Sequence, residues 1–287
     1  MKWVQFKRKH EPNGRIALGV QEADGQVRLF ADGLELRTLI EQIADLPPGA
    51  EPPAPPVYAP VLAPDDIVLC APIAKPEKLI FVGLNYRDHA AESNMAVPQV
   101  PVLFPKYPNA IVGPDADVVI PAEVRECDYE AELAVVIGKR AKRVRPEDAM
   151  SHVFGYTIIN DVSARDMQLH EGQWTRGKAI DTFAPMGPCV VTRDEIPDPG
   201  RLDISLTLNG EIMQQSNTRE LIFDIPYLVS FLSRTMTLEP GDIISTGTPP
   251  GVGMGRTPPV WLRHGDVTEI EVAGIGKLRS RYIQEQI

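Results

Sequence analysis

Two glutamates on one face of a predicted strand are the first residues whose types and spacing indicate chemistry. In residues 126–138, ECDYEAELAVVIG, apolar and polar side chains alternate, as they do in a strand. Glu130 and Glu132 then share a face about 7 Å apart, followed there by Ala134 and Val136. Buried charge is costly without a partner, and oxygen ligands favour Mg²⁺, Mn²⁺ or Ca²⁺ over zinc. The pattern predicts a divalent-metal site, with two solvated surface glutamates as the alternative.

A third carboxylate follows at the end of a second apolar run. Residues 154–160 read as a strand that ends at Asp161, and ligands gather at strand ends. A helical continuation would place Asp161, Arg165 and Gln168 at steps of four and three on one face. Arg165 and Gln168 beside a metal would suit a substrate carboxylate. The alternative is a helix-capping Asp161 with a solvated arginine.

A histidine with a nearby carboxylate supplies a candidate base. His89 and Glu92 are three residues apart in the stretch NYRDHAAE, so on a helical turn they share a face. A carboxylate beside an imidazole orients it and raises its basicity, which is how a general base is built. The alternative is an ordinary salt contact on the surface.

Two further candidates lie in loops. Lys178 stands in the Gly- and Pro-punctuated loop of residues 173–188 and could serve as an oxyanion partner, unless it only solvates a surface. Thr248 lies in the glycine-rich loop of residues 246–253, which lacks the GxGxxG pattern of a dinucleotide site. Its hydroxyl and the backbone N–H groups around it could hold a carboxylate.

The elements that must position these residues fall into two parts. Residues 47–64 hold eight prolines, which predicts an extended connector rather than a helix or central strand. We therefore expect a small N-terminal domain over residues 1–70 and a catalytic domain over residues 71–287. Residues 104–106 and 109–114 are predicted as loop. Further strands are predicted at residues 3–6, 16–20, 27–30, 78–82, 204–208, 211–214, 243–245, 267–272 and 276–282, with helices near 36–43 and after Asp224.

Composition limits the classes of function. The net charge is −10 and the isoelectric point about 5.1, which argues against nucleic acid or an anionic membrane as a partner. No run of 18 apolar residues predicts a membrane span. The start, MKWVQFKRKH, has no apolar signal segment, and the cysteines are odd in number without CxxC spacing. We therefore expect a cytoplasmic protein, with Cys127 as a buried spectator thiol.

Several segments, in their order, resemble the fumarylacetoacetate hydrolase family. They are FVGLNYRDHAAE, DYEAELAVVIGK, FGYTIINDVSARDMQ, QWTRGKAIDTFAPMGP and GDIISTGTPPGVG, between residues 72 and 275. The tail GRTPPVWLRHGD, with the QWTRGK loop, is most similar to the branch called fumarylacetoacetate hydrolase domain-containing protein two. The resemblance implies a homodimer and a fold that is mainly β with some α. That fold would be a mixed β-sandwich roll of the family's C-terminal type, with a small N-terminal α+β domain.

The resemblance also implies roles for the candidate residues. The family shares one substrate handle, a 2-oxo acid whose keto and carboxylate oxygens chelate the metal. Mg²⁺ or Mn²⁺ would be held by Glu130, Glu132 and Asp161. The catalytic residues would be His89, Glu92 and Lys178, and the substrate contacts Arg165, Gln168 and Thr248.

Three functions are compatible with these residues. The leading expectation is a metal-dependent hydrolase of C–C bonds in small acylpyruvates or β-diketo acids. His89 and Glu92 would activate a water while Lys178 stabilises the oxyanion. The alternative, favoured by the branch, is an oxaloacetate tautomerase or decarboxylase, or an isomerase of a related 2-oxo acid. A non-catalytic 2-oxo acid binding protein is the third, although binding alone needs no base. The expected partner is a small 2-oxo or 2,4-dioxo acid, with no nucleic acid or membrane.

Overall fold

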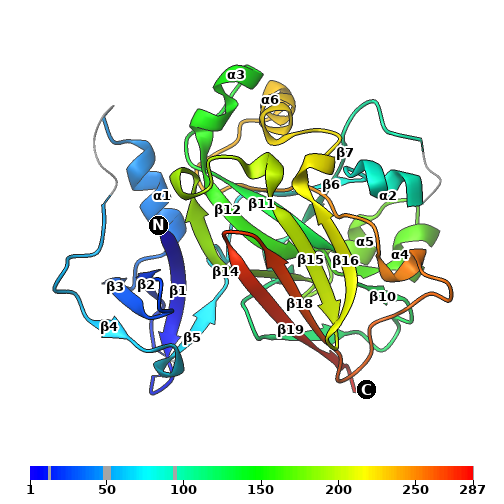
Figure 1. Ribbon diagram of the computed structural model, residues 1–287, viewed down its shortest axis with the longest axis horizontal. Coiled ribbons are helices and arrows are strands. Elements are labelled where there is room, and N and C mark those ends of the chain that lie inside the picture. Colours follow the sequence, from blue (N-terminus) through cyan, green and yellow to red (C-terminus); the bar gives the residue numbers. More distant parts are fainter. Residues whose placement is uncertain (12–13, 48–52, 93–95, 287) are drawn as a thin grey trace.

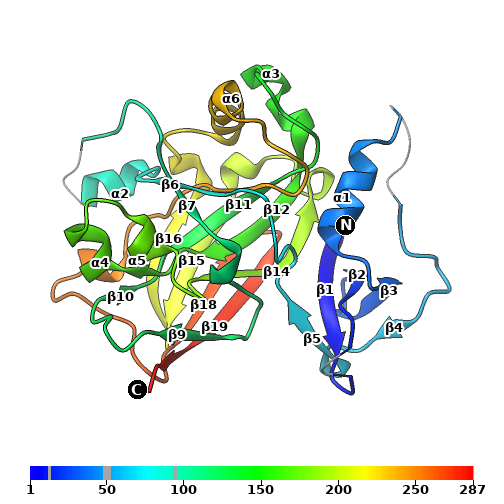
Figure 2. The same cartoon turned by 180° about the vertical axis from the view of Figure 1, so that it is seen from behind.

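One large sheet forms the framework of the computed structural model (Figures 1 and 2). The structure describes residues 1–11, 14–47, 53–92 and 96–286, with the backbone alone for residues 90–92. Within these residues the large sheet has 12 strands. They are β1 Lys2–Arg8, β2 Ala17–Gln21, β3 Val27–Asp32, β4 Val61–Leu62, β5 Ile67–Cys70, β6 Leu79–Gly83, β7 Val102–Lys106, β8 Ile111–Val112, β11 Ala131–Ile137, β12 Val153–Asn160, β14 Ala184–Thr192 and β17 Ile243–Ser245.

The order of these strands gathers several strand ends at one edge. Ten strands follow the order β4-β3-β2-β1-β14-β12-β11-β17-β6-β7, while β5 pairs with β1 and β8 with β14. β11 is antiparallel to both β12 and β17, and β17 is parallel to β6. The start of β11 therefore lies beside the ends of β6, β12 and β17. Every one of these positions leads into a segment that holds candidate site residues.

A smaller sheet packs over the large one and completes a sandwich. Its strands are β9 Asp117–Ile120, β15 Asp203–Leu208, β16 Glu211–Asn217, β18 Val267–Val272 and β19 Gly276–Gln284. They follow the order β16-β15-β18-β19-β9 and contact β11, β12 and β14 of the large sheet. A separate short ladder joins β10 Cys127–Asp128 to β13 Ser163–Ala164. The mainly β fold class is confirmed.

The central strand β11 is buried on both faces. Leu133, Val135 and Ile137 belong to the core between the two sheets. Ala134 and Val136 belong to a second core on the other side of the large sheet. All seven residues of β11 are buried, as expected of a strand covered on both sides. The predicted alternation of the two faces is thus confirmed.

The helices lie at the margins of the sandwich (Figures 1 and 2). Asp224 caps the longest one, because its Oδ1 accepts a hydrogen bond from the N–H of Tyr227 at 2.8 Å, as predicted. No helix in the described segments is both long and apolar enough to cross a membrane. The helices are α1 Leu36–Ala44, α2 Arg87–Glu92, α3 Pro146–Ala149, α4 Arg165–His170, α5 Thr175–Lys178 and α6 Ile225–Thr235.

The N-terminal strands extend the large sheet. β1, β2 and β3 form the predicted antiparallel unit, followed by the predicted helix α1. β1 also pairs with β14, where Trp3 faces Val190 in register. Strands from both sides of residue 70 therefore belong to one sheet. The division into two domains at that position stays a prediction.

Three segments predicted as loop contain strands or a helix, so those predictions are wrong. The segment of residues 173–188 contains α5 and the start of β14. Residues 104–106 belong to β7, which pairs antiparallel with β6. Pro105 hid this strand, because proline cannot donate to a central ladder. β7 lies at the end of the sheet, where one edge needs no donor. Ile111–Val112 forms β8 beside β14.

Candidate active site

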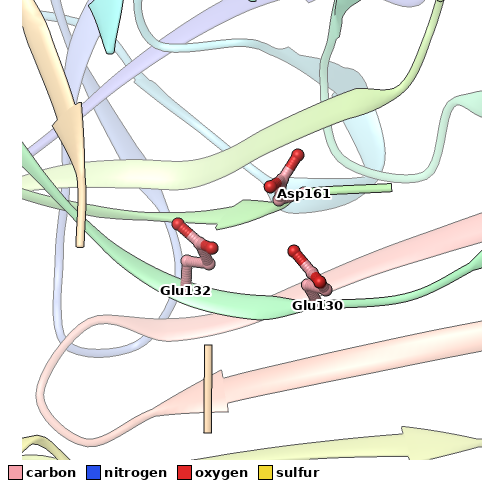
Figure 3. A group of neighbouring side chains, drawn as sticks. All are labelled: Glu130, Glu132 and Asp161. Carbon is pink, nitrogen blue, oxygen red and sulfur yellow. The ribbon is translucent and has the colours of Figure 1, made fainter. Parts of the chain in front are cut away.

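Three carboxylates converge at the edge where β11 begins and β12 ends. Glu130 directly precedes β11, Glu132 lies within it, and Asp161 directly follows β12. One oxygen from each lies within 4.8 Å of the others, and all three residues are buried. Figure 3 shows the carboxylates pointing toward a common space. The backbone fixes this approach, because Asp161 N donates to Glu130 O at 2.9 Å.

The sequence predicted these neighbours for only partly the right reason. Glu130 and Glu132 share a strand face, as expected. Asp161 does not share a helical face with Arg165 and Gln168, because residues 163–164 form β13 and α4 begins at Arg165. Strand pairing, and not helical spacing, brings Asp161 to the site.

Arg165 ties the carboxylates to a neighbouring loop. Its guanidinium donates to Glu130 Oε1 at 2.5 Å, to Asp128 Oδ2 at 2.9 Å and to Gln168 Oε1 at 2.9 Å. Asp128 in turn accepts a hydrogen bond from Gly253 N at 2.7 Å. The guanidinium therefore orients Glu130. Through Asp128 it also connects Glu130 to the loop that contains Gly253. Substrate binding by Arg165 and Gln168 stays a prediction.

Two buried lysines face the same carboxylates. Lys178 Nζ donates to Glu130 Oε2 at 2.7 Å and to Asp161 Oδ2 at 2.6 Å. Lys106 Nζ lies 2.5 Å from Asp161 Oδ1 and donates to the carbonyl oxygens of Val162 and Phe183. Desolvation lowers the pKa of Lys106 to about 8, although the negative charge of Asp161 acts to raise it. Both cations offset the negative charge of the cluster.

Burial and mutual repulsion set the protonation of the carboxylates. Desolvation raises the pKa of Glu132 well above its usual range, and the charges of Asp161 and Glu130 add to this. Desolvation also raises the pKa of Asp161, although two lysines oppose it. For Glu130 the attraction of Arg165 and Lys178 outweighs desolvation and lowers the pKa. Acids that repel one another in this way are stabilised by a cation placed between them.

The donor set fits a hard divalent cation. All three candidate ligands are carboxylates, the ligands that Mg²⁺, Mn²⁺ and Ca²⁺ prefer. Asp161 Oδ1 is buried and lies 2.5 Å from Lys106 Nζ. The charges of Asp161 and Glu130 repel that of Glu132, and a cation placed among the three carboxylates would stabilise them. The site can therefore hold a divalent metal.

The end of β17 and the loop after it support the second glutamate. Glu132 Oε2 accepts hydrogen bonds from Ser245 Oγ at 2.5 Å and from Gly247 N at 3.1 Å. Thr248 Oγ1 accepts one from Gln214 Nε2 at 2.8 Å, and Gln214 Oε1 accepts one from Ala131 N at 2.9 Å. Gln214 thereby links β11 to this loop. The link keeps the Thr248 side chain near the carboxylates.

The segment that carries the candidate base is anchored just before α2 and in its first turn. The Asn85 amide donates to the carbonyl oxygens of Phe223 at 3.0 Å and Thr246 at 2.8 Å. Asp88 accepts a hydrogen bond from Ser216 Oγ at 2.6 Å. α2 is helical where predicted. The Glu92 side chain lies outside the part that the structure describes, so the His89–Glu92 dyad stays a prediction.

One cavity of about 380 Å³ brings the candidates together. It has the size of a pocket for a small metabolite. Apolar walls from Val82, Leu84, Phe104, Leu169 and Trp174 face the charged end. The predicted site residues that line it are His89, Glu130, Glu132, Asp161, Arg165, Gln168, Lys178 and Thr248.

Comparison with known proteins identifies the family. The model described as "Fumarylacetoacetate (FAA) hydrolase C-terminal" matches residues 78–283. The chain belongs to the fumarylacetoacetate hydrolase family. It is 43% identical over 283 residues to "Oxaloacetate tautomerase fahd2, mitochondrial" from Xenopus laevis, which covers 97% of this chain and 89% of the relative.

Solved structures of the family share the whole fold. A fumarylacetoacetate hydrolase from Exiguobacterium antarcticum is 39% identical with a TM-score of 0.85, over 99% of this chain and 100% of that one. A 5-carboxymethyl-2-hydroxymuconate delta-isomerase from Mycobacterium smegmatis is 36% identical with a TM-score of 0.80, over the full length of both chains. The predicted family is therefore confirmed, and its members carry the names of a tautomerase, a hydrolase and an isomerase.

The comparisons also correct one expectation. The Xenopus relative is named as a mitochondrial protein. The expected cytoplasmic location is therefore wrong. The cysteines and the first ten residues were its grounds, and neither distinguishes the cytoplasm from a mitochondrial compartment.

Sequence reasoning missed two charged residues of this family site. Asp128 stands two and four residues before Glu130 and Glu132, so the same alternation placed it on their side. Lys106 shares a strand face with Val102 and Phe104, a pattern that Pro105 obscured. A lysine at a buried position of a strand requires an acid partner, which here is Asp161.

Metal removal should leave the fold intact. β11 packs into a core on each side, independently of the three carboxylates. We expect chelation by EDTA to abolish activity while far-ultraviolet circular dichroism stays unchanged. Unfolding on chelation, or full activity in metal-free buffer, would contradict this prediction.

Proposed function

We propose that this chain is a divalent-metal-dependent oxaloacetate tautomerase. The reaction moves one proton between C3 and the oxygen on C2, and so interconverts the keto and enol forms. The proposal rests on one observation: a cavity that joins an imidazole, a buried ammonium and a carboxylate triad in a chain 43% identical to a named oxaloacetate tautomerase.

The residues divide the proton transfer between them. His89 would take the proton from C3, or return it there in the reverse direction, as a general base or acid. Lys178 would stabilise negative charge on the C2 oxygen of the enolate. Glu130, Glu132 and Asp161 would hold Mg²⁺ or Mn²⁺, which supplies Lewis acidity toward the keto and carboxylate oxygens. Glu92 would orient His89.

Hydrolysis of acylpyruvates is the second candidate. A structural neighbour named as a fumarylacetoacetate hydrolase matches 99% of this chain. The same imidazole would then activate water instead of moving a substrate proton. We rank tautomerisation first, because the relative that matches 97% of the chain at 43% identity carries that name. The homodimer and the absence of nucleic acid or membrane partners stay predictions.

A substrate panel with one histidine variant tests the proposal. Purified protein with Mg²⁺ should speed the decay of the enol absorbance of oxaloacetate and release neither pyruvate nor CO₂. His89→Gln should cut the rate by about 10²–10⁴-fold, the usual loss for a general acid–base group. His264→Gln is the matched control, because His264 is exposed and lies outside the cavity lining.

Two outcomes would overturn the assignment. Cleavage of acetylpyruvate or fumarylpyruvate without tautomerase activity would make the chain a hydrolase. Equal rates for His89→Gln and the native protein would exclude His89 as the proton carrier. Metal affinity, measured by calorimetry, should remain unchanged in His89→Gln, because the carboxylate triad is retained.

A further inference from the structure

A strongly basic segment follows β11 at the end opposite the candidate active site. Residues 139–145, KRAKRVR, hold five basic residues and no acidic one, in a chain whose net charge is −10. All five side chains are exposed. The segment joins β11 to α3, which lies beside α6 and away from α2, α4 and α5 in both views (Figures 1 and 2).

The backbone of this segment is held in place. Ala141 exchanges two hydrogen bonds with Leu238, at 2.8 and 2.9 Å. Arg143 N donates to Ser233 O at 2.8 Å, and Val144 N donates to Ser233 Oγ at 3.0 Å. These basic residues therefore differ from those of a flexible charged tail. A ligand that binds them would meet a backbone already in place, which lowers the entropic cost of binding relative to a flexible tail.

Arg143 occupies an unusual backbone conformation. Its φ is 53°, in the left-handed region that favours glycine. A long side chain held in this region is a reason to look for a function. In the described part of the chain Arg143 forms no ion pair, and Lys142 donates to the carbonyl oxygen of Thr235 at 3.1 Å. These two cations therefore keep their charge available to an anion.

The basic residues surround a hollow. A cavity of about 450 Å³ is lined by Arg140, Lys142, Arg143 and Arg145, with His152 and a single carboxylate. That carboxylate, Asp148, pairs with Arg145 at 2.7 Å, and Arg145 also pairs with Glu147 at 3.2 Å. Arg140 pairs with Glu239 at 3.2 Å outside the lining. Positive charge thus exceeds negative charge on the walls of the cavity.

We propose that this basic cavity binds a soluble phosphate-bearing anion with at least two negative charges, such as a pyrophosphate group. Guanidinium groups match phosphate oxygens in geometry and charge. The hollow is open to solvent and large enough to receive a small anion. The inference does not depend on the function proposed for the other site.

Binding of inorganic pyrophosphate to the full chain tests this inference. Calorimetry should show saturable binding of one pyrophosphate, weakened by added salt. The variant Lys142→Gln/Arg143→Gln should weaken binding by about tenfold or more, because hydrogen bonds to charged groups are strong. The control Lys277→Gln/Arg281→Gln removes the same charge from exposed positions of β19 and should bind normally.

A single variant separates charge from folding. Arg143→Gly removes the guanidinium and places glycine where φ is 53°. It should unfold at the same temperature or higher, yet bind pyrophosphate more weakly. Equal loss in the control variant, or no binding by the native chain, would overturn the proposal. Binding to vesicles of anionic phospholipid without binding to pyrophosphate would overturn the soluble ligand.

Discussion

Replacing Glu132 by glutamine should remove metal affinity while leaving the fold intact. The amide oxygen of glutamine can still accept the hydrogen bonds from Ser245 and Gly247. The substitution removes one anionic candidate ligand. It also removes a carboxylate whose charge is repelled by the charges of Asp161 and Glu130. Substituting a residue that only supports a metal ligand typically weakens metal binding by about 10–100-fold. Losing a ligand itself should weaken metal binding at least as much. Activity at low metal concentration should therefore fall about a hundredfold or more.

Calorimetry with Mn²⁺ and chemical denaturation together check this result. The free energy of unfolding without metal should be unchanged or higher in Glu132→Gln, because a buried like charge is removed. Glu271→Gln is the matched control, because the Glu271 side chain is 55% exposed on β18. Native Mn²⁺ affinity in Glu132→Gln would show that Glu132 is not a ligand.

Replacing Lys178 by methionine should affect both stability and catalysis. Lys178 is 2% exposed and bridges Glu130 and Asp161, so its loss leaves buried acids short of positive charge. Breaking a buried pair in this way typically costs about 3–5 kcal/mol. A divalent ion offers replacement charge, so saturating Mg²⁺ should restore part of the lost free energy of unfolding.

Activity should not return with that stability. Loss of one group that stabilises an oxyanion lowers turnover by about 10²–10³-fold. Lys178→Met at saturating Mg²⁺ should therefore be folded and nearly inactive. Lys277→Met, at a side chain 55% exposed, should change neither property. Recovery of full turnover with metal would show that Lys178 acts only by neutralising the acids.

Local patterns in the sequence predicted most elements of the fold. β15 and β16 lie where strands were predicted at residues 204–208 and 211–214. The Asn209-Gly210 pair between them has φ of 52° and 87°, as a tight hairpin requires. Asp224 begins α6 as its capping pattern indicated. These features succeeded because a few neighbouring residues decide them. β7 was missed because its proline is acceptable only at a sheet edge, and no local pattern reveals an edge.

The candidate site was predicted in part for the same reason. Strand alternation alone is enough to place Glu130 and Glu132 on one face. The sequence could not show that Lys178 contacts Glu130, 48 residues away, or that Lys106 contacts Asp161. The sequence also could not show that Arg165 contacts Asp128 and Glu130.

The sequence by itself determined the types of the reactive groups and the elements that carry them, because alternation and capping are local properties. Only the tertiary structure decided how those groups share their charge. The order of β6, β17, β11 and β12 brings strand ends together from distant parts of the chain. Burial at that edge pairs Glu130 and Asp161 with buried cations, and that pairing is a property of the assembled sheet.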